Sequence, residues 1–322
     1  MADIALIIST TLMYATPLIF ASLGGVFSEN AGIVNIGIEG MMTVGAFAGA
    51  AAGFLTGNPW LAFLIGGMAG ALFALIHAIA TISFNADHTI SGVAINLLAP
   101  GVALFTSKIL FDGATTTPTI PTESKMPKPL NGVFEQGSFL DTIFNSYITV
   151  YLAFILVFIT WYVLYKTKFG LRIRAVGEHP GAADTLGINV SKTRYLAVII
   201  SGFLAGLGGA SMSLAVVSSF RPTLISGQGY IAMAAVIFGK WRPQWAMAAC
   251  LLFGFSTAMS VYLGNPQLPI QIDENLLSMI PYIVTIIVLI LFVKRSKAPA
   301  ALGNAYKKGE RYEEDVKRDR RR

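Results

Sequence analysis

Tyr147-Ile-Thr-Val-Tyr-Leu-Ala-Phe-Ile-Leu-Val-Phe-Ile-Thr-Trp-Tyr-Val-Leu-Tyr165 is an unbroken stretch without a charged side chain. It is about as long as the ~20 apolar residues that a bilayer-spanning helix needs. A shorter stretch, Tyr230–Gly239, follows the turn Gly227–Gly229 and predicts a half-span or part of a broken helix. The sequence therefore predicts an all-α integral membrane protein with about 8–10 transmembrane helices, some of them discontinuous. The other long apolar stretches are Ile4–Phe27, Ile36–Leu55, Trp60–Ser83, Ile90–Leu110, Tyr195–Val217, Gln244–Leu263 and Ser278–Val293.

The composition agrees with a lipid environment. Hydrophobic residues make up 54% of the chain and charged residues 12%, and the mean hydropathy is +0.65. A soluble domain carries about 25% charged residues. The net charge of +6 comes from basic residues that lie almost entirely from Lys166 onward, with few aromatic residues between them to stack bases. We therefore expect membrane lipid, and no nucleic acid, around this chain.

The positions of lysine and arginine predict the sidedness. Basic residues concentrate in the loop 166–194, in the turn Lys240–Arg242 and in the tail 294–322, which predicts that all three are cytoplasmic. The loop 111–146 is rich in Pro and Thr and carries acidic residues, which fits the outer side. We thus expect a permease domain at 1–293 in the cytoplasmic membrane, with a cytoplasmic C-terminus.

The N-terminal side is less constrained. Counting spans backwards places the N-terminus outside, but the first 100 residues hold no Lys or Arg, so one re-entrant segment would reverse this assignment. No basic region precedes the first apolar stretch, so we expect that stretch to remain as a helix.

A weak internal repeat is present. An offset of 184 residues aligns Gly45–Ala74 with Gly229–Ala258, with identical residues at nine of thirty positions, Pro59/Pro243 among them. Shared Ala and Gly composition is an alternative explanation. If the repeat is real, its copies lie an odd number of spans apart and are inverted, as in many transporters.

The loop 166–194 contains a candidate short helix. Pro180 suits its first position and Gly187 its end, and Glu178 lies just before its start, where a carboxylate favours the helix dipole. Its exposed face is expected to present Ala182 and Ala183. Such a helix suits the groove of another protein, and a merely solvated basic loop is the alternative.

Two stretches carry a resemblance. Thr167-Lys-Phe-Gly-Leu-Arg-Ile-Arg-Ala-Val-Gly-Glu-His-Pro-Gly-Ala-Ala-Asp-Thr-Leu-Gly-Ile-Asn-Val190 resembles the coupling loop of ABC importer permeases for branched-chain amino acids, ribose-type sugars and nucleosides. Ser28-Glu-Asn-Ala-Gly-Ile-Val-Asn-Ile-Gly-Ile-Glu-Gly-Met-Met-Thr-Val-Gly-Ala46 is similar to the second signature of that family. The preceding Thr16-Pro-Leu-Ile-Phe-Ala-Ser-Leu-Gly-Gly-Val-Phe-Ser-Glu29 resembles the nucleoside (guanosine-type) members that work with a basic-membrane-protein-type binding lipoprotein. The resemblance covers about Pro17 to Val293.

This resemblance implies a set of partners. They are a nucleotide-binding ATPase subunit, a second permease that is either a similar chain or a copy of this one, and an external solute-binding lipoprotein. ATP and Mg²⁺ are expected on the ATPase subunit, with no cofactor on this chain, which lacks the glycine-rich Lys-Ser/Thr loop that cradles phosphates. The residues implied to dock with the ATPase are Glu178, His179, Pro180, Ala182, Ala183, Gly187 and Ile188.

Polar residues inside the apolar stretches are candidates for a solute pathway. A charge at membrane depth costs about 3 kcal/mol on insertion scales, so Glu39 needs a reason, and Asn35 lies one turn before it. One interpretation is a polar lining for a hydrogen-bonding solute. The other is that these groups cap or hold a discontinuous helix. The candidate pathway residues are Asn30, Asn35, Glu39, Asn96 and Gln228.

No catalytic or metal site is expected. His77 is interpreted as a packing or hydrogen-bonding residue, His88 as solvated and Cys250 as a small buried hydrophobe. No histidine pair has metal-ligand spacing, and no nucleophile, base and acid stand near one another. The function predicted is import of nucleosides. Branched-chain amino acid or sugar import, a gradient-driven secondary transporter and a channel or scaffold subunit are the alternatives.

Overall fold

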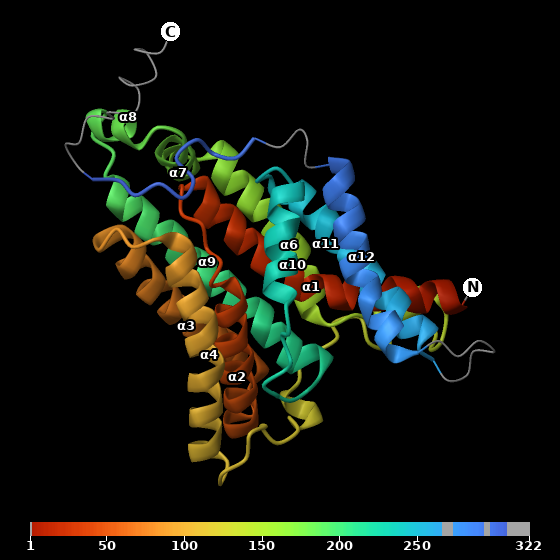
Figure 1. Cartoon of the computed structure of the whole chain (residues 1–322). Coiled ribbons are helices and arrows are strands. Elements are labelled where there is room, and N and C mark those ends of the chain that lie inside the picture. The colour runs from red at the N-terminus through yellow and green to blue at the C-terminus, as the bar shows by residue number, and fades with distance from the viewer. Residues whose placement is uncertain (1, 266–272, 293–296, 308–322) are drawn as a thin grey trace.

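The structure is a computed structural model that describes residues 2–265, 273–292 and 297–307 (Figure 1). Seven helices of this described part are long and apolar enough to cross a membrane, and α10 is a shorter apolar helix. This confirms the predicted all-α membrane architecture. The helices are α1 (Ala2–Asn30), α2 (Ile38–Thr56), α3 (Pro59–Ala78), α4 (His88–Leu110), α5 (Phe139–Phe144), α6 (Ile148–Lys166), α7 (Lys168–Glu178), α8 (Pro180–Thr185), α9 (Val190–Ser211), α10 (Gln228–Phe238), α11 (Pro243–Leu263) and α12 (Glu274–Phe292).

Local chemistry sets where several helices begin. Asn58 caps α3, its side-chain oxygen accepting hydrogen bonds from the backbone N–H of Trp60 at 3.0 Å and Leu61 at 3.2 Å. Asp87 accepts from the N–H of Ile90 at 2.9 Å at the start of α4. Proline stands at the first position of both α3 and α11, where the missing N–H has no intrahelical partner in any case.

Helix α9 is the centre of the bundle. It packs against α1, α2 and α3, and Figure 1 shows it between α1 and the group α2–α3–α4. Gly206 of α9 makes this close packing possible: a Cβ there would lie 3.1 Å from the Cα of Gly67 and would overlap the carbonyl of Gly66. Without a hydrophobic drive between helices in lipid, such backbone contact supplies the packing energy.

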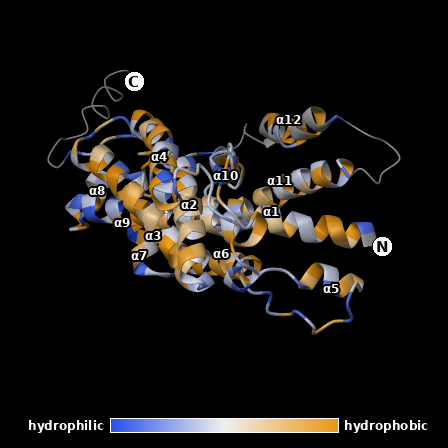
Figure 2. Cartoon of the chain, turned by 90° about the horizontal axis from the view of Figure 1, so that it is seen from below, coloured by the Kyte–Doolittle hydropathy of each residue, from blue (hydrophilic) through white to orange (hydrophobic). Residues whose placement is uncertain are grey.

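One end of the molecule carries α7, α8, Arg194 and Lys240, and we call it the basic end. Helix α1 finishes there, because the carbonyl of Ala31 accepts a 3.2 Å hydrogen bond from Nε of Arg194, near the start of α9. The N-terminal end of α1 therefore points away from the loop 166–194, as counting spans backwards predicted. Figure 2 shows hydrophilic residues around α8 and the start of α9, and predominantly apolar residues along the long helices.

Two helices begin in the middle of the bundle. After α1 the chain turns inward, and Nδ2 of Asn35 donates a 3.0 Å hydrogen bond to Oγ of Ser201, halfway along α9. Helix α2 starts there and runs to the far end, where Gly53 faces Leu214. Helix α10 also starts at mid-depth, with Gly229 against Glu39, and runs to the basic end, where Nδ2 of Asn30 bonds the Trp241 carbonyl at 3.1 Å.

These directions agree with an inverted repeat. In the first copy the chain runs towards the basic end in α1, returns to mid-depth and leaves towards the far end in α2. In the second copy α9, the segment 217–227 and α10 follow the same path in the opposite sense. Pro59 begins α3 at the far end and Pro243 begins α11 at the basic end, at the offset of 184 that the sequence alignment uses.

The loop 166–194 and the tail differ from simple solvated segments. Arg194, expected in a basic loop, is only 2% exposed. Of the predicted tail 294–322, residues 294–296 and 308–322 lie outside the described residues, and residues 297–307 pack onto the basic end, with Ala301 at 2% exposure.

Candidate functional site

Glu39 joins α2 and α10, the two helices that begin in the middle of the bundle and that we call the half-helices. Its Oε1 accepts a 2.6 Å hydrogen bond from the backbone N–H of Gly227, and its Oε2 accepts a 2.7 Å bond from that of Gly229. These N–H groups belong to the N-terminus of α10, which carries a positive partial charge. Glu39 lies in the first turn of α2, so its carboxylate stands at the N-termini of both helices.

Asn96 of α4 holds the same junction from the side. Its Oδ1 accepts from the N–H of Gly40 at 2.8 Å. Its Nδ2 donates to the carbonyl of Ile36 at 2.9 Å and to the hydroxyl of Tyr230 at 3.0 Å. The structure thus gives Glu39 and Asn96 the helix-holding contacts that were one of the two interpretations of these residues.

The remaining pathway candidates divide into two groups. Asn35 and Gln228 lie at the junction, and each has a buried side-chain oxygen without a hydrogen-bond partner. Asn30 lies at the basic end instead, where Nδ2 bonds the Val26 carbonyl at 2.7 Å as well as Trp241. The structure therefore brings four of the five predicted residues together and separates Asn30 from them.

The junction is open on one face of this chain. Tyr230 of α10 is 48% exposed and Tyr282 of α12 is 54% exposed. A Cβ at Gly227 would lie 3.7 Å from the Tyr282 hydroxyl, which places both tyrosines beside the junction. Sequence reasoning missed these two residues. Their signal was an aromatic residue directly after the Gly-Gln-Gly turn and a tyrosine within the last apolar stretch.

Helix α8 has the predicted boundaries at the basic end. Pro180 is its first residue, and Gly187, with φ +79°, follows its end as an αL residue of the kind that terminates helices. Ala182 is exposed, but the expectation that Ala183 shares that face is wrong, because Ala183 is 3% exposed and packs with Val176 and Val190. Pro180 and Ala183 are three residues apart and so occupy one inward face.

The outward face of α8 carries a residue that sequence reasoning missed. Leu186 is 81% exposed directly after the helix, and His179 before it is also exposed. The available signal was a large apolar side chain directly before Gly187, at the predicted end of the helix. Glu178 turns instead towards the tail, its Oε2 accepting a 3.3 Å hydrogen bond from the N–H of Ala300.

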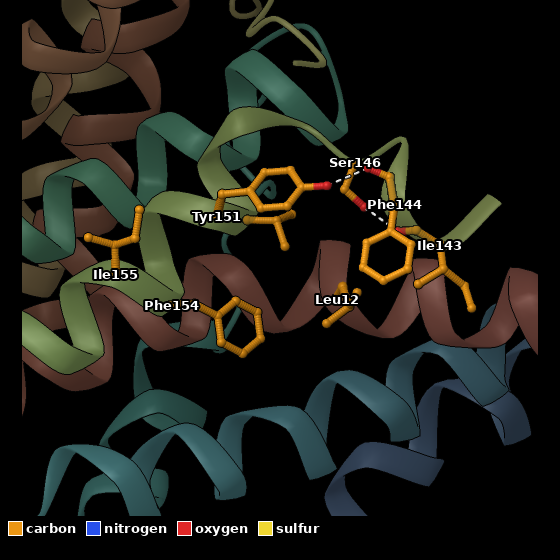
Figure 3. Close-up of a pocket in the computed structure, with 8 residues that line it drawn as sticks. Leu12, Ile143, Phe144, Ser146, Tyr151, Phe154 and Ile155 are labelled. Atoms are coloured by element: carbon orange, nitrogen blue, oxygen red, sulfur yellow. Dashed lines mark hydrogen bonds between the residues drawn. The ribbon is translucent and has the colours of Figure 1, made fainter. Parts of the chain in front are cut away.

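An apolar pocket of about 390 Å³ lies elsewhere, between α1, α5 and α6 (Figure 3). Leu12, Phe154 and Ile155 line it, and the hydroxyl of Tyr151 at its rim donates to the Phe144 carbonyl. Its lining offers almost no polar surface to a hydrogen-bonding solute. Among the described residues, no cluster of three His, Cys, Asp or Glu side chains is placed to hold a metal ion.

Known proteins resemble this chain along nearly its whole length. It is 47% identical to the guanosine ABC transporter permease protein NupQ of Bacillus subtilis over 96% of this chain and 98% of that protein. It is 42% identical to the nucleoside ABC transporter permease protein NupC of Lactococcus lactis over 94% and 96%. A second Bacillus subtilis protein, the guanosine ABC transporter permease protein NupP, is 28% identical over 94% and 85%.

The family model described as "branched-chain amino acid transport system / permease component" matches residues 7–289, which include both half-helices, their junction and α8. With seven helices among the described residues that are long and apolar enough to cross a membrane, this chain belongs to the family of branched-chain amino acid transport system permease components.

Proposed function

We propose that this chain is the permease subunit of an ATP-binding-cassette importer that moves nucleosides across the cytoplasmic membrane. The observation that carries the proposal is the similarity to permeases named for guanosine and nucleoside transport. The identity to these two relatives is 47% and 42%, over almost the full length of each. Branched-chain amino acids or sugars are the alternative cargoes.

The solute pathway is proposed at the junction of the half-helices. Polar side chains at membrane depth face a protein interior, a cavity or a partner, because lipid does not satisfy them. Asn35, Glu39, Asn96 and Gln228 meet at that depth, and the two exposed tyrosines open the junction towards α4 and α12. In this arrangement Glu39 and Asn96 hold the backbone, while Tyr230 presents its exposed aromatic ring to a solute. Gln228 lies beside it, with a buried side-chain oxygen that has no hydrogen-bond partner. Asn30, a pathway candidate from the sequence, is not part of this lining.

The ATPase subunit is proposed to dock on α8. The exposed groups there include His179, Ala182 and Leu186. A Cβ added to Gly187 would meet no atom within 4 Å. Pro180, Ala183 and Ile188 form the inner side that connects α8 to α7 and α9. In this proposal ATP and Mg²⁺ bind the ATPase subunit, and this chain transmits the resulting movement of α8 to its other helices.

The second permease is proposed to be a different chain of the same family. Both NupQ and NupP of Bacillus subtilis are named guanosine ABC transporter permeases, and this chain is 47% identical to one and 28% to the other. That difference fits a heterodimer in which this chain occupies the NupQ-like position. The basic end is proposed to be cytoplasmic, because it holds α7, α8 and most loop lysines and arginines. The loop 111–146 then faces the external binding lipoprotein.

Transport by the reconstituted complex tests the whole proposal. Proteoliposomes that contain both permeases and the ATPase should take up guanosine delivered by the binding lipoprotein when ATP is enclosed. A dead Walker lysine in the ATPase should abolish that uptake. Undiminished uptake with the dead ATPase would identify a gradient-driven transporter instead. Competition by unlabelled adenosine, leucine and ribose ranks the cargo classes.

Leu186→Ala tests the docking surface. The matched control is Leu140→Ala, because Leu140 is also exposed, at 49%, on the equally short helix α5 at the far end. Copurification of the ATPase subunit with the permease should fall for the α8 variant and stay unchanged for the α5 variant. Equal retention of the ATPase by both would remove Leu186 from the docking surface.

A further inference from the structure

The C-terminal segment Pro299–Tyr306, which we call the strap, lies across the basic end. Ala301 is 2% exposed and Leu302 packs against the main hydrophobic core. The strap follows α12 in sequence but contacts segments from the first and middle thirds of the chain. Nothing in the sequence patterns assigned this segment a role, because it has neither helical nor strand periodicity.

The strap bonds two segments at once. The N–H of Ala301 donates to the carbonyl of Gly177 in α7 at 2.8 Å, and the N–H of Gly303 donates to the carbonyl of Gly32 at 3.0 Å. Gly32 belongs to the segment 31–37 that leads from α1 to the start of α2. Successive backbone donors of the strap thus join the α7–α8 region to that re-entrant segment.

Arg194 and Tyr306 complete the connection. Arg194 lies beneath the strap, with Nε donating to the carbonyl of Ala31 at 3.2 Å and Nη1 donating to the carbonyl of Asn304 at 3.1 Å. Tyr306 packs against the cluster that α8 shares with α7 and α9, whose members include Ala183. The start of α9, the strap and the re-entrant segment are therefore held as one unit.

The re-entrant segment carries this connection to mid-depth. Val34 is fixed on both sides, its N–H donating to Nδ1 of His88 at 3.3 Å and its carbonyl lying 3.1 Å from Nε2 of His77. Ile36 is bonded by Asn96, and the junction begins directly after it. A displacement of α7 and α8 therefore has a bonded route, through the strap, to the start of α2.

We propose that the strap is a positioning element that makes α7–α8 and the re-entrant segment move together, so that motion at α8 reaches the junction of the half-helices. This inference rests on the proposed docking of an ATPase on α8. The inference assigns the strap to the residues that couple α8 to the junction. A merely solvated tail would have no such role. Without the strap, Gly177 of α7 would keep its direct packing against Asn30 and Gly32, but the backbone hydrogen bonds of the strap to Gly177 and Gly32 would be lost.

Two matched pairs of variants test the strap in the complete complex of both permeases, ATPase and binding lipoprotein. Ala301→Asp places a carboxylate at a buried position, and Ala305→Asp makes the same change at an exposed position of the strap. The second pair ends the chain after Ser296, which removes the strap, or after Lys307, which keeps it. Guanosine uptake and ATP hydrolysis are measured in the same proteoliposomes.

We expect Ala301→Asp, which displaces the strap, and the shorter truncation to lower the guanosine imported per ATP hydrolysed. A decrease of about tenfold is expected, the factor by which losing two backbone hydrogen bonds would weaken the link between α7 and the re-entrant segment. The ATPase should remain bound and hydrolyse ATP, and the two control variants should keep the ratio of the unaltered complex. An unchanged ratio in both strap variants overturns the inference, and so does loss of the ATPase from both, which would make the strap a docking or folding element. If the unaltered complex itself shows no ATP-dependent uptake, the proposed function fails instead.

Discussion

The substitution Glu39→Gln tests whether Glu39 holds the two half-helices together or binds the solute. The carboxylate accepts two backbone hydrogen bonds, at 2.6 and 2.7 Å, from the N-terminus of α10. Both lengths lie at or just below the range for charge-assisted bonds. A glutamine at this position keeps one acceptor oxygen and turns an NH₂ group towards the other backbone N–H.

The expected cost follows from those two contacts. A hydrogen bond to a charged group contributes about 1.5–3 kcal/mol, and a buried donor left unpaired costs about 1–3 kcal/mol. One bond is lost in the variant and the other is no longer charge-assisted, so we expect a loss of about 2–4 kcal/mol of stability. The loss concerns the junction, so it should lower the melting temperature of the purified complex by several degrees.

The assay combines thermal unfolding with uptake kinetics. Glu39→Gln should lower the melting temperature, while the KM for guanosine of the folded fraction stays near that of the unaltered complex. Glu123→Gln is the control, because Glu123 is exposed in the loop 111–146. A raised KM for guanosine with an unchanged melting temperature would refute the helix-holding role and make Glu39 a solute ligand.

Three further predictions concern packing and sidedness. Gly206→Ala should lower the melting temperature of the complex, because a Cβ there overlaps the backbone of α3. The control Gly101→Ala should leave the melting temperature unchanged or raise it slightly, because no atom lies within 4 Å of the added Cβ. Equal effects of the two variants would contradict the packing of α9. Arg194→Met should cost about 2–4 kcal/mol of stability, because two backbone carbonyls lose a charged donor, and an unchanged melting temperature of the complex would remove it from the unit beneath the strap. Membrane-impermeant maleimide on intact cells should label Val133→Cys but label Ala305→Cys only after permeabilisation, and the reverse pattern would invert the proposed orientation.

The membrane spans were predictable because lipid imposes a length and an apolar composition that can be read residue by residue. The depth at which a span begins was not. Ile36–Leu55 is long enough to cross a bilayer, yet α2 starts beside Ser201 at the middle of α9. Only the contact with α9 distinguishes a helix that starts at mid-depth from one that starts at a surface. The shortness of α10 was one local sign of discontinuity, and the polar residues Asn35 and Glu39 at the start of the apolar stretch were another.

The sequence identified which residues belong to the candidate site better than it identified what those residues do. Glu39 and Asn96 stood out because charged and amide groups are costly in lipid, but their partners are backbone groups of distant segments, and no side-chain pattern marks those. Arg194 looked like any other basic loop residue, since its burial depends on the strap, which lies 110 residues later in the chain. Ala183 was assigned to the wrong face because α8 is too short to show a period.

The chemistry of the junction bears on which solute is moved. Two helix N-termini meet at mid-depth, and each carries a positive partial charge that would suit an anion. In transporters with broken helices, such ends point at anionic groups of the substrate. Here the carboxylate of Glu39 already occupies the N-terminus of α10, so a second carboxylate would be repelled from it. A branched-chain amino acid brings that carboxylate together with an ammonium group, and a nucleoside, which is neutral at pH 7, brings neither charge. The exposed ring of Tyr230 suits stacking on a nucleobase, so excess leucine should leave guanosine uptake unchanged where adenosine competes with it.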